Sequence, residues 1–238
     1  VNSFRPPLWL LHQLSPTLRF VSLKDQQYPV SGDAVLRALC NDVLNTLDVS
    51  KAFVMKTTLP DCLWNQVSLT QFEMLRSHGH GDQNFFDENS DQYPGMTRGD
   101  MFLVESWVPS SLVHLENLVT FRCCDNYEQT KVTAHMKEAY VHGLTGEFPQ
   151  LPTSLQILNL GNNKLEGPIP LQWCTLHDLT VLRLYSLPNL NGSIPSCLGQ
   201  LRNVYILSFE NLAGVSGEIP WNTFRKTFSQ STINGKTL

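Results

Sequence analysis

Residues 155–220 read LQILNLGNNKLEGPIPLQWCTLHD, LTVLRLYSLPNLNGSIPSCLGQLRN and VYILSFENLAGVSGEIP, which is one pattern written nearly three times. The glycines of its G-x-I-P step, Gly167, Gly192 and Gly217, follow one another at intervals of 25 residues. A fixed period in this range is typical of a solenoid, in which each repeat buries its apolar face only against its neighbours. The stretch therefore predicts stacked coils.

The residues of one unit predict how a coil is built. Leu158 and Leu160 alternate with Asn159, which is the period-2 signal of a short strand with one buried face. Asn163 follows where the chain must leave the strand, and a buried Asn can satisfy backbone groups of the turn. Gly167 then permits a turn with positive φ.

The spacing L-x-x-L-x-L-x-x-N-x-L-x-G-x-I-P resembles the plant-type subclass of leucine-rich repeats. The layout is similar to plant receptor ectodomains, and also to leucine-rich-repeat surface antigens of trypanosomatid parasites, whose repeats often place Trp after the I-P step, as Trp173 does here. The resemblance implies an α/β solenoid, a right-handed superhelix of about seven or eight coils with a concave parallel β-sheet and an irregular convex side. It also implies non-catalytic binding of a protein, peptide or glycan at a cell surface.

The rest of the chain carries the pattern less regularly. Strand-like triplets are expected around Val21, Leu47 and Phe72, with a short helical turn over 34–40. Residues 76–106 are interpreted as a long loop or a degenerate repeat, and 125–142 as a second insertion. Residues 225–238 are interpreted as a weak C-terminal cap or the start of another unit. We expect one domain over residues 1–238, as a fragment of a longer protein.

Composition and motifs exclude several classes of function. The 238 residues are 42% hydrophobic and 16% charged with a net charge of −4, and no basic stripe suggests nucleic-acid binding. No apolar run is long enough to span a membrane within the chain, although an anchor outside it is compatible with the sequence. No G-x-S-x-G, phosphate loop, H-E-x-x-H or C-x-x-C occurs, so we expect no enzyme, cofactor or metal site.

The six cysteines lie far apart along the chain, apart from one adjacent pair. Because their spacings do not match those of a disulfide-rich domain, the sequence favours buried or half-buried free thiols over a disulfide framework. They are Cys40, Cys62, Cys123, Cys124, Cys174 and Cys197.

Exposed positions on the concave face are the candidate ligand-binding residues, because arrays of this kind bind partners there. They are Asp48, Glu73, Arg122, Asn159, Arg183, Tyr185 and Glu210. Tyr185 beside Arg183 and Arg122 is the strongest candidate, since aromatic and Arg side chains dominate protein interfaces. Asn191, within Asn191-Gly192-Ser193, is the candidate N-glycosylation site.

Two motifs in the stretch 76–106 are weaker. His78 and His80 suggest a metal site, but no third ligand is evident, and a surface loop is the preferred interpretation. Arg98-Gly99-Asp100 spells the integrin-binding tripeptide, a match that arises often by chance.

Two hypotheses of function follow. The first is a cell-surface or secreted recognition module that binds a protein, peptide or glycan. The alternative is an intracellular structural scaffold subunit of a larger complex. The repeat type and the Asn191 motif favour the first, whereas unpaired cysteines favour the second.

Overall fold

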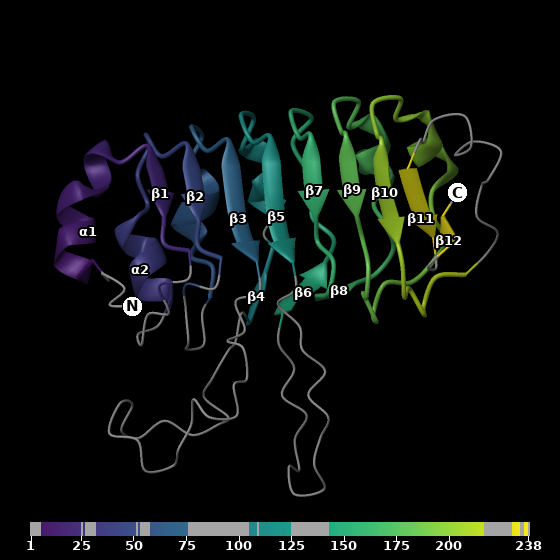
Figure 1. Ribbon diagram of the computed structural model, residues 1–238, viewed down its shortest axis with the longest axis horizontal. Helices are drawn as coiled ribbons and strands as arrows, with labels where there is room; N and C mark the ends of the chain where they lie inside the picture. Colours follow the sequence, from purple (N-terminus) through teal and green to yellow (C-terminus); the bar gives the residue numbers. More distant parts are fainter. Residues whose placement is uncertain are drawn as a thin grey trace, which may run out of the picture.

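The computed structural model describes residues 6–24, 26, 32–50, 52, 58–75, 105–108, 110–124, 143–216, 230–233 and 236–237. They form a single row of stacked coils, with the N-terminus at one end and the C-terminus at the other (Figure 1). Each coil contributes one short strand, and the strands lie side by side across the row. The predicted solenoid is confirmed.

The large sheet forms the concave face. Within the described residues it has nine strands in the order β1-β2-β3-β5-β7-β9-β10-β11-β12. All pair in parallel with their neighbours except β11 and β12, which are antiparallel. Their bounds are β1 Phe20–Ser22, β2 Thr46–Asp48, β3 Gln71–Leu75, β5 Thr120–Cys124, β7 Ile157–Asn159, β9 Val181–Arg183, β10 Ile206–Phe209, β11 Gln230–Ile233 and β12 Lys236–Thr237.

A second, smaller parallel sheet runs along one flank, at the lower edge of Figure 1. Its strands are β4 (Glu105–Trp107), β6 (Gly143–Glu147) and β8 (Lys164–Glu166). Two isolated parallel bridges, Gly167 with Leu190 and Gly192 with Val215, follow in the next coils. The G-x-I-P step thus forms a flank ladder. Gly167 and Gly192 have φ of +86° and +77°, as the predicted turn requires.

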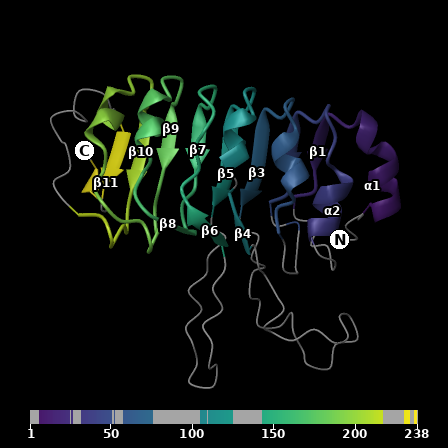
Figure 2. The ribbon, with the colours of Figure 1, turned by 180° about the vertical axis from the view of Figure 1, so that it is seen from behind.

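Short helices line the side opposite the sheet, as seen from behind in Figure 2. Pro60, Pro170 and Pro195 stand immediately before three of them, because proline has the φ of a first helical turn and no N–H to satisfy. The α-helices are α1 Leu8–Leu14 and α2 Gly32–Ala38, and the 3-10 helices are η1 Ser15–Thr17, η2 Asp61–Asn65, η4 Ser110–His114, η5 Leu171–Thr175 and η6 Ser196–Gln200. The helical turn expected over 34–40 corresponds to α2.

The core lies between the large sheet and these helices. The repeat leucines Leu158, Leu182 and Leu207 are at most 1% exposed, and they meet apolar residues from the convex side. Trp64 packs edge-on against Phe72 and Phe121, with ring centroids 5.8 and 6.1 Å apart. Because each coil buries these side chains only against its neighbours, the apolar core runs the length of the row.

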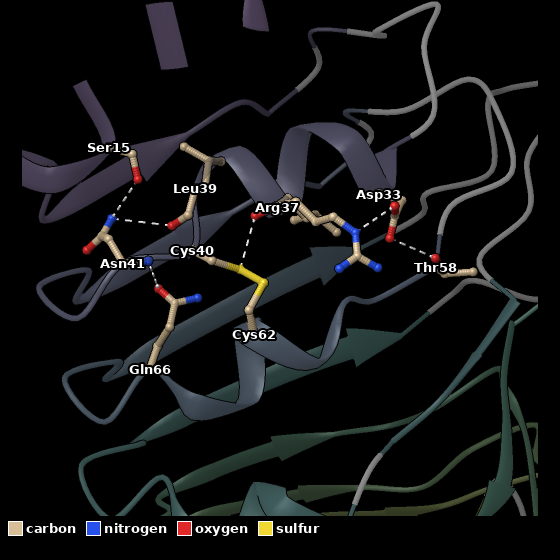
Figure 3. The surroundings of a disulfide bond; sticks show 10 residues. Ser15, Asp33, Arg37, Leu39, Cys40, Asn41, Thr58, Cys62 and Gln66 are labelled. Atoms are coloured by element: carbon tan, nitrogen blue, oxygen red, sulfur yellow. Dashed lines mark hydrogen bonds and ion pairs between the residues drawn. A yellow bond between two sulfur atoms is a disulfide. The ribbon is translucent and has the colours of Figure 1, made fainter. Parts of the chain in front are cut away.

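The prediction of free cysteines is wrong for four of the six. Cys40 pairs with Cys62 (Figure 3) and Cys174 pairs with Cys197, with Cα–Cα distances of 5.8 and 5.6 Å. The bonded residues are 22 and 23 positions apart, slightly less than one repeat, so stacking brings them together from adjacent convex sides. Cys123 and Cys124 are buried and belong to neither disulfide, as the sequence suggested.

Strand pairing shows which strands are neighbours on either side of the stretches 76–106 and 125–142, where the repeat pattern is irregular. β3 pairs directly with β5, from Gln71 with Thr120 to Leu75 with Cys124, so these two strands are neighbours in the sheet. β4, whose first two residues fall in the stretch 76–106, joins the flank sheet. The rest of that stretch, with both of its motifs, and residues 125–142 lie outside the described residues. Their interpretation stays a prediction, as does that of 225–238, where β11 and β12 extend the sheet.

Candidate ligand-binding surface

Five of the predicted residues, Asp48, Glu73, Arg122, Asn159 and Arg183, lie in one continuous row across the sheet. Strand register pairs each residue with the next, so that seven coils contribute one side chain each. In spatial order the row is Ser22, Asp48, Glu73, Arg122, Asn159, Arg183 and Ser208. Because residues two apart on a strand share a face, each member has a neighbour on both sides along its own strand. The concave face is therefore a grid of side chains.

One half of this grid is polar and internally paired. We call it the Glu73 patch, and it comprises Thr46, Asp48, Ser50, Gln71, Glu73, Leu75, Thr120, Arg122 and Cys124. Glu73 Oε1 accepts a hydrogen bond from Gln71 Nε2 at 2.9 Å and lies 3.5 Å from Arg122 Nη1. Asp48 Oδ1 accepts the N–H of Ser50 at 3.0 Å. The charged groups of this half thus already have partners within the protein.

The other half is more apolar, and its central cation has no such partner. We call it the Arg183 patch, and it comprises Ile157, Asn159, Gly161, Val181, Arg183, Tyr185, Ile206, Ser208 and Glu210. Among the described residues, no carboxylate forms an ion pair with Arg183. Its side chain is partly exposed, with Val181 and Tyr185 on either side along the strand direction. An unpaired guanidinium beside an aromatic ring is a good anchor for a ligand.

Asn159 does not lie as predicted. It is 3% exposed, and its Oδ1 accepts the N–H of Gly161 at 3.1 Å. A short amide side chain at a strand end hydrogen-bonds its own backbone two residues on, which the alternation of leucines does not reveal. Asn159 therefore supports the turn, and we remove it from the set of ligand-facing residues.

Tyr185 is held in place by a glycine in the preceding coil. A Cβ added to Gly161 would collide with the Tyr185 ring, so the ring lies directly over this backbone. The neighbouring Asn162 donates its N–H to the Tyr185 carbonyl at 2.6 Å, which continues the strand pairing. Glu210 follows Ser208, the register partner of Arg183, by two residues, and it accepts a hydrogen bond from Ser208 Oγ at 3.0 Å.

Sequence reasoning missed one row of this surface. Ile157, Val181 and Ile206 are in register and lie two residues before the predicted row. They form an apolar stripe beside Arg183, with exposed Tyr205 next to Ile206. The signal was available, since the period of two that places Arg183 on the concave face also places Val181 there.

Comparison with known proteins finds plant receptors among the proteins that are similar to this chain. No protein-family model matches the chain. Receptor-like protein 32 of Arabidopsis thaliana is 43% identical over 74 residues, which are 30% of this chain and 8% of that protein. The solved plant peptide hormone receptor RGFR1 in complex with RGF2 has a TM-score of 0.54 and 26% identity, covering 81% of this chain and 24% of that one.

Two further receptor structures share the fold. A TDR receptor has a TM-score of 0.56 and 20% identity, covering 82% of this chain and 27% of that one. The Arabidopsis receptor kinase HAESA, with the peptide hormone IDA and the co-receptor SERK1, has a TM-score of 0.54 and 21% identity, covering 96% and 35%. The chain has the leucine-rich-repeat fold of these receptors. It spans a quarter to a third of these solved chains.

Two shallow cavities of this leucine-rich-repeat protein lie away from the concave grid. One, of about 460 Å³, is lined by residues of α1, η1 and α2 and of the turn after α2, including His12, Arg37 and Asn41. Arg37 is paired with Asp33 at 2.9 Å, a hydrogen bond that raises the pKa of the guanidinium. The other, of about 360 Å³, is lined by Thr153, Ser154, Thr175, His177 and Asp178.

The described residues contain neither a metal-ligand cluster nor a membrane-crossing helix. No three His, Cys, Asp or Glu side chains gather there as a metal site would need. Every helix in this part of the leucine-rich-repeat protein is too short or too polar to cross a bilayer. Asn191 lies on the flank, where it is exposed and its N–H donates to the Gly167 carbonyl at 3.0 Å.

Proposed function

We propose that this chain is a non-catalytic recognition module, exposed outside the cell, that binds a peptide or protein ligand at the Arg183 patch. The observation that carries the proposal is the position of Arg183. It stands on the concave face without an ion-pair partner among the described residues, whereas Arg122 is paired with Glu73. A buried or half-buried cation is best stabilised by an opposite charge, which a ligand would supply.

The surroundings of Arg183 suit a peptide chain. Val181, with Ile157 and Ile206 beside it, provides an apolar stripe on one side. Tyr185 provides an aromatic ring on the other side, and its position over Gly161 limits its freedom. An extended peptide that places an apolar side chain on the stripe and an acidic group on Arg183 would use both. Rigid aromatic and Arg anchors dominate protein interfaces in general.

The disulfides support a location outside the cytoplasm. Both bonds join adjacent coils, and such bonds persist in oxidising compartments. The alternative of an intracellular scaffold drew on free cysteines, and four of the six are paired.

The comparisons support the class of ligand. RGFR1, which resembles this chain, was solved as a peptide hormone receptor in complex with RGF2. The 43% identical segment belongs to a protein named as receptor-like. A glycan is the second candidate ligand, since an aromatic side chain on an open face suits a sugar as well as a peptide. Arg183, which has no ion-pair partner in the described part of the chain, favours an acidic peptide.

The proposal is tested by selecting ligands without assuming their identity. The secreted chain is used to select binders from a displayed library of random twelve-residue peptides, and their affinities are measured by calorimetry. We expect Arg183→Glu and Tyr185→Ala each to weaken binding about tenfold or more, a loss of about 1.4 kcal/mol. Arg202→Glu is the matched control, since Arg202 is exposed in the turn before β10.

Two results would contradict the proposal. One is a set of selected peptides whose affinity is the same for both patch variants and for the control. The other is a library that yields no binder, although circular dichroism shows that the chain is folded and both disulfides are formed.

A further inference from the structure

The flank ladder presents one tripeptide to solvent in a fixed backbone conformation. Asn191-Gly192-Ser193 is the only N-x-S/T sequence in the 238 residues, and all three residues are exposed. The backbone on both sides of Asn191 is held, because Leu190 bridges Gly167 and Gly192 bridges Val215. The backbone is fixed while the side-chain amide faces water.

The neighbouring coils pack closely against the backbone of the tripeptide. On one side stands exposed Pro168, whose Cβ would lie 3.3 Å from a Cβ added to Gly192. On the other side stands Gly214, where an added Cβ would meet the Leu190 carbonyl and lie 3.7 Å from Asn191 Cα. Gly214 must therefore lack a side chain, because the backbone of its coil lies close to that of Leu190 and Asn191, which helps to fix the tripeptide.

The side chain of Asn191 is also unused within the described part of the protein. Other asparagines at turns have structural roles: the Asn163 side chain is 0% exposed and makes four hydrogen bonds. Two residues before the tripeptide, Asn189 Nδ2 lies 3.4 Å from the Lys164 carbonyl. No described residue hydrogen-bonds the Asn191 amide, so modification there breaks no contact of the fold.

The disulfides give an independent reason to place the chain where such modification occurs. Cys174–Cys197 joins η5 to η6, and its second cysteine follows Ser193 by only four residues. Both disulfide formation and Asn glycosylation belong to the secretory route.

We propose that Asn191 carries an N-linked glycan, an inference that rests on the extracellular location proposed above. The donor is a lipid-pyrophosphate-linked oligosaccharide. Asn191 Nδ2 forms a bond to the anomeric carbon, the bond from that carbon to the pyrophosphate oxygen breaks, and the amide nitrogen loses one proton. The lipid pyrophosphate leaves, and no oxidant or reductant is needed.

The glycan has a consequence for how partners approach. Tyr185 lies six residues before Asn191, and the chain turns from the concave face to the flank between them, at Ser186 and buried Leu187. A glycan at Asn191 therefore covers the flank around the two bridges and leaves the Arg183 patch open. A second protein that contacts the ligand-bound module is excluded from this part of the flank.

The test is the intact mass of the chain secreted from a eukaryotic host, before and after an N-glycosidase. We expect a mass excess of one glycan on the wild type, with Asp in place of Asn191 after enzymatic release. Asn191→Gln and Ser193→Ala each abolish the excess, whereas Asn189→Gln, the matched control, retains it. The affinity of peptides selected on the Arg183 patch is unchanged by Asn191→Gln.

Secreted, disulfide-bonded wild-type chain with an unmodified Asn191 overturns the inference and leaves ligand binding untouched. A glycosylated chain that selects no peptide contradicts the proposed function alone. Peptide binding that changes when the glycan is lost shows that the glycan reaches the concave face, which overturns the placement argued above.

Discussion

The buried side chain of Asn163 holds Leu144 in place, since its Oδ1 accepts the N–H of Leu144 at 3.0 Å. Its Nδ2 donates to the carbonyl of Cys123 at 2.7 Å and to that of Leu160 at 2.9 Å. Cys123 stands near the end of β5 and Leu144 near the start of β6, so one side chain ties the two strands that flank residues 125–142.

Asn163→Ala is expected to destabilise the protein strongly. The change leaves the N–H of Leu144 and the carbonyl of Cys123 buried without these partners, and each such loss costs about 1–3 kcal/mol. We expect the free energy of unfolding in urea to fall by about 2–4 kcal/mol. Asn189→Ala, which removes only an exposed 3.4 Å contact, is the control and should change it by less than about 0.5 kcal/mol. Equal effects of the two variants would contradict the role of Asn163.

The disulfides predict a definite pattern of thiol reactivity. Native protein should take up no alkylating reagent, because Cys123 and Cys124 are buried and the other four cysteines are bonded. Protein unfolded without reductant should take up two equivalents, and reduced unfolded protein six, as counted by mass spectrometry. Six equivalents without reductant would show that neither bond forms in solution.

Removal of the Cys174–Cys197 bond should lower stability without abolishing the fold. The bond closes a loop of 23 residues, and a constraint of that length contributes about 3 kcal/mol. Cys174→Ser with Cys197→Ser should therefore lower the free energy of unfolding by about that amount. Cys123→Ser is the control, since it removes a buried sulfur without breaking a disulfide. A double variant as stable as the wild type would contradict the predicted contribution of the disulfide to stability.

The coils could be predicted from the sequence because the leucine, asparagine and glycine positions within each repeat indicate its strand and its turn. Leu158, Leu182 and Leu207 recur in phase, and this phase alone fixes which side chains are buried and which face the concave row. The row from Asp48 to Arg183 could be read in the same way, apart from the buried Asn159.

Three features could not be read, because two of them depend on contacts between coils and one depends on a local turn. The cysteine pairs are offset by two or three residues from the repeat period, so they do not show as equivalent positions. The burial of Asn159 depends on its hydrogen bond to Gly161. The flank sheet requires pairing between loops whose residues, such as Lys164 and Thr145, have no strand-like alternation.

The contact between Gly161 and Tyr185 predicts coupling between two positions. Gly161→Ala places a methyl group against the ring and forces it to move, which costs about 1–3 kcal/mol in a packed site. In a Tyr185→Ala background the same change should cost much less, because the space is open. A double-mutant cycle on urea unfolding should give a coupling of at least about 0.5 kcal/mol. Additive effects would mean that the ring does not lie over Gly161 in solution.

Ser186 offers a stabilising change beside the Arg183 patch. Asn162, Ser186 and Asn211 occupy equivalent positions after the strands, with φ of 54°, 51° and 53°. Asn tolerates this left-handed conformation better than other residues with a Cβ, for which it costs about 1–2 kcal/mol. Ser186→Asn should therefore raise the free energy of unfolding by about 0.5–1 kcal/mol. The Ser186 N–H donates to the Glu210 carbonyl at 2.8 Å, and this bond is retained.

The control for this change is Ser196→Asn, at an exposed position of η6 where φ is not positive. It should bring no gain, since no left-handed strain is relieved there. Because Tyr185 precedes Ser186, the Asn variant should hold the ring at least as firmly and preserve the affinity of peptides selected on the Arg183 patch. A stabilised variant with weakened peptide binding would instead indicate that the strain at Ser186 is needed to present Tyr185.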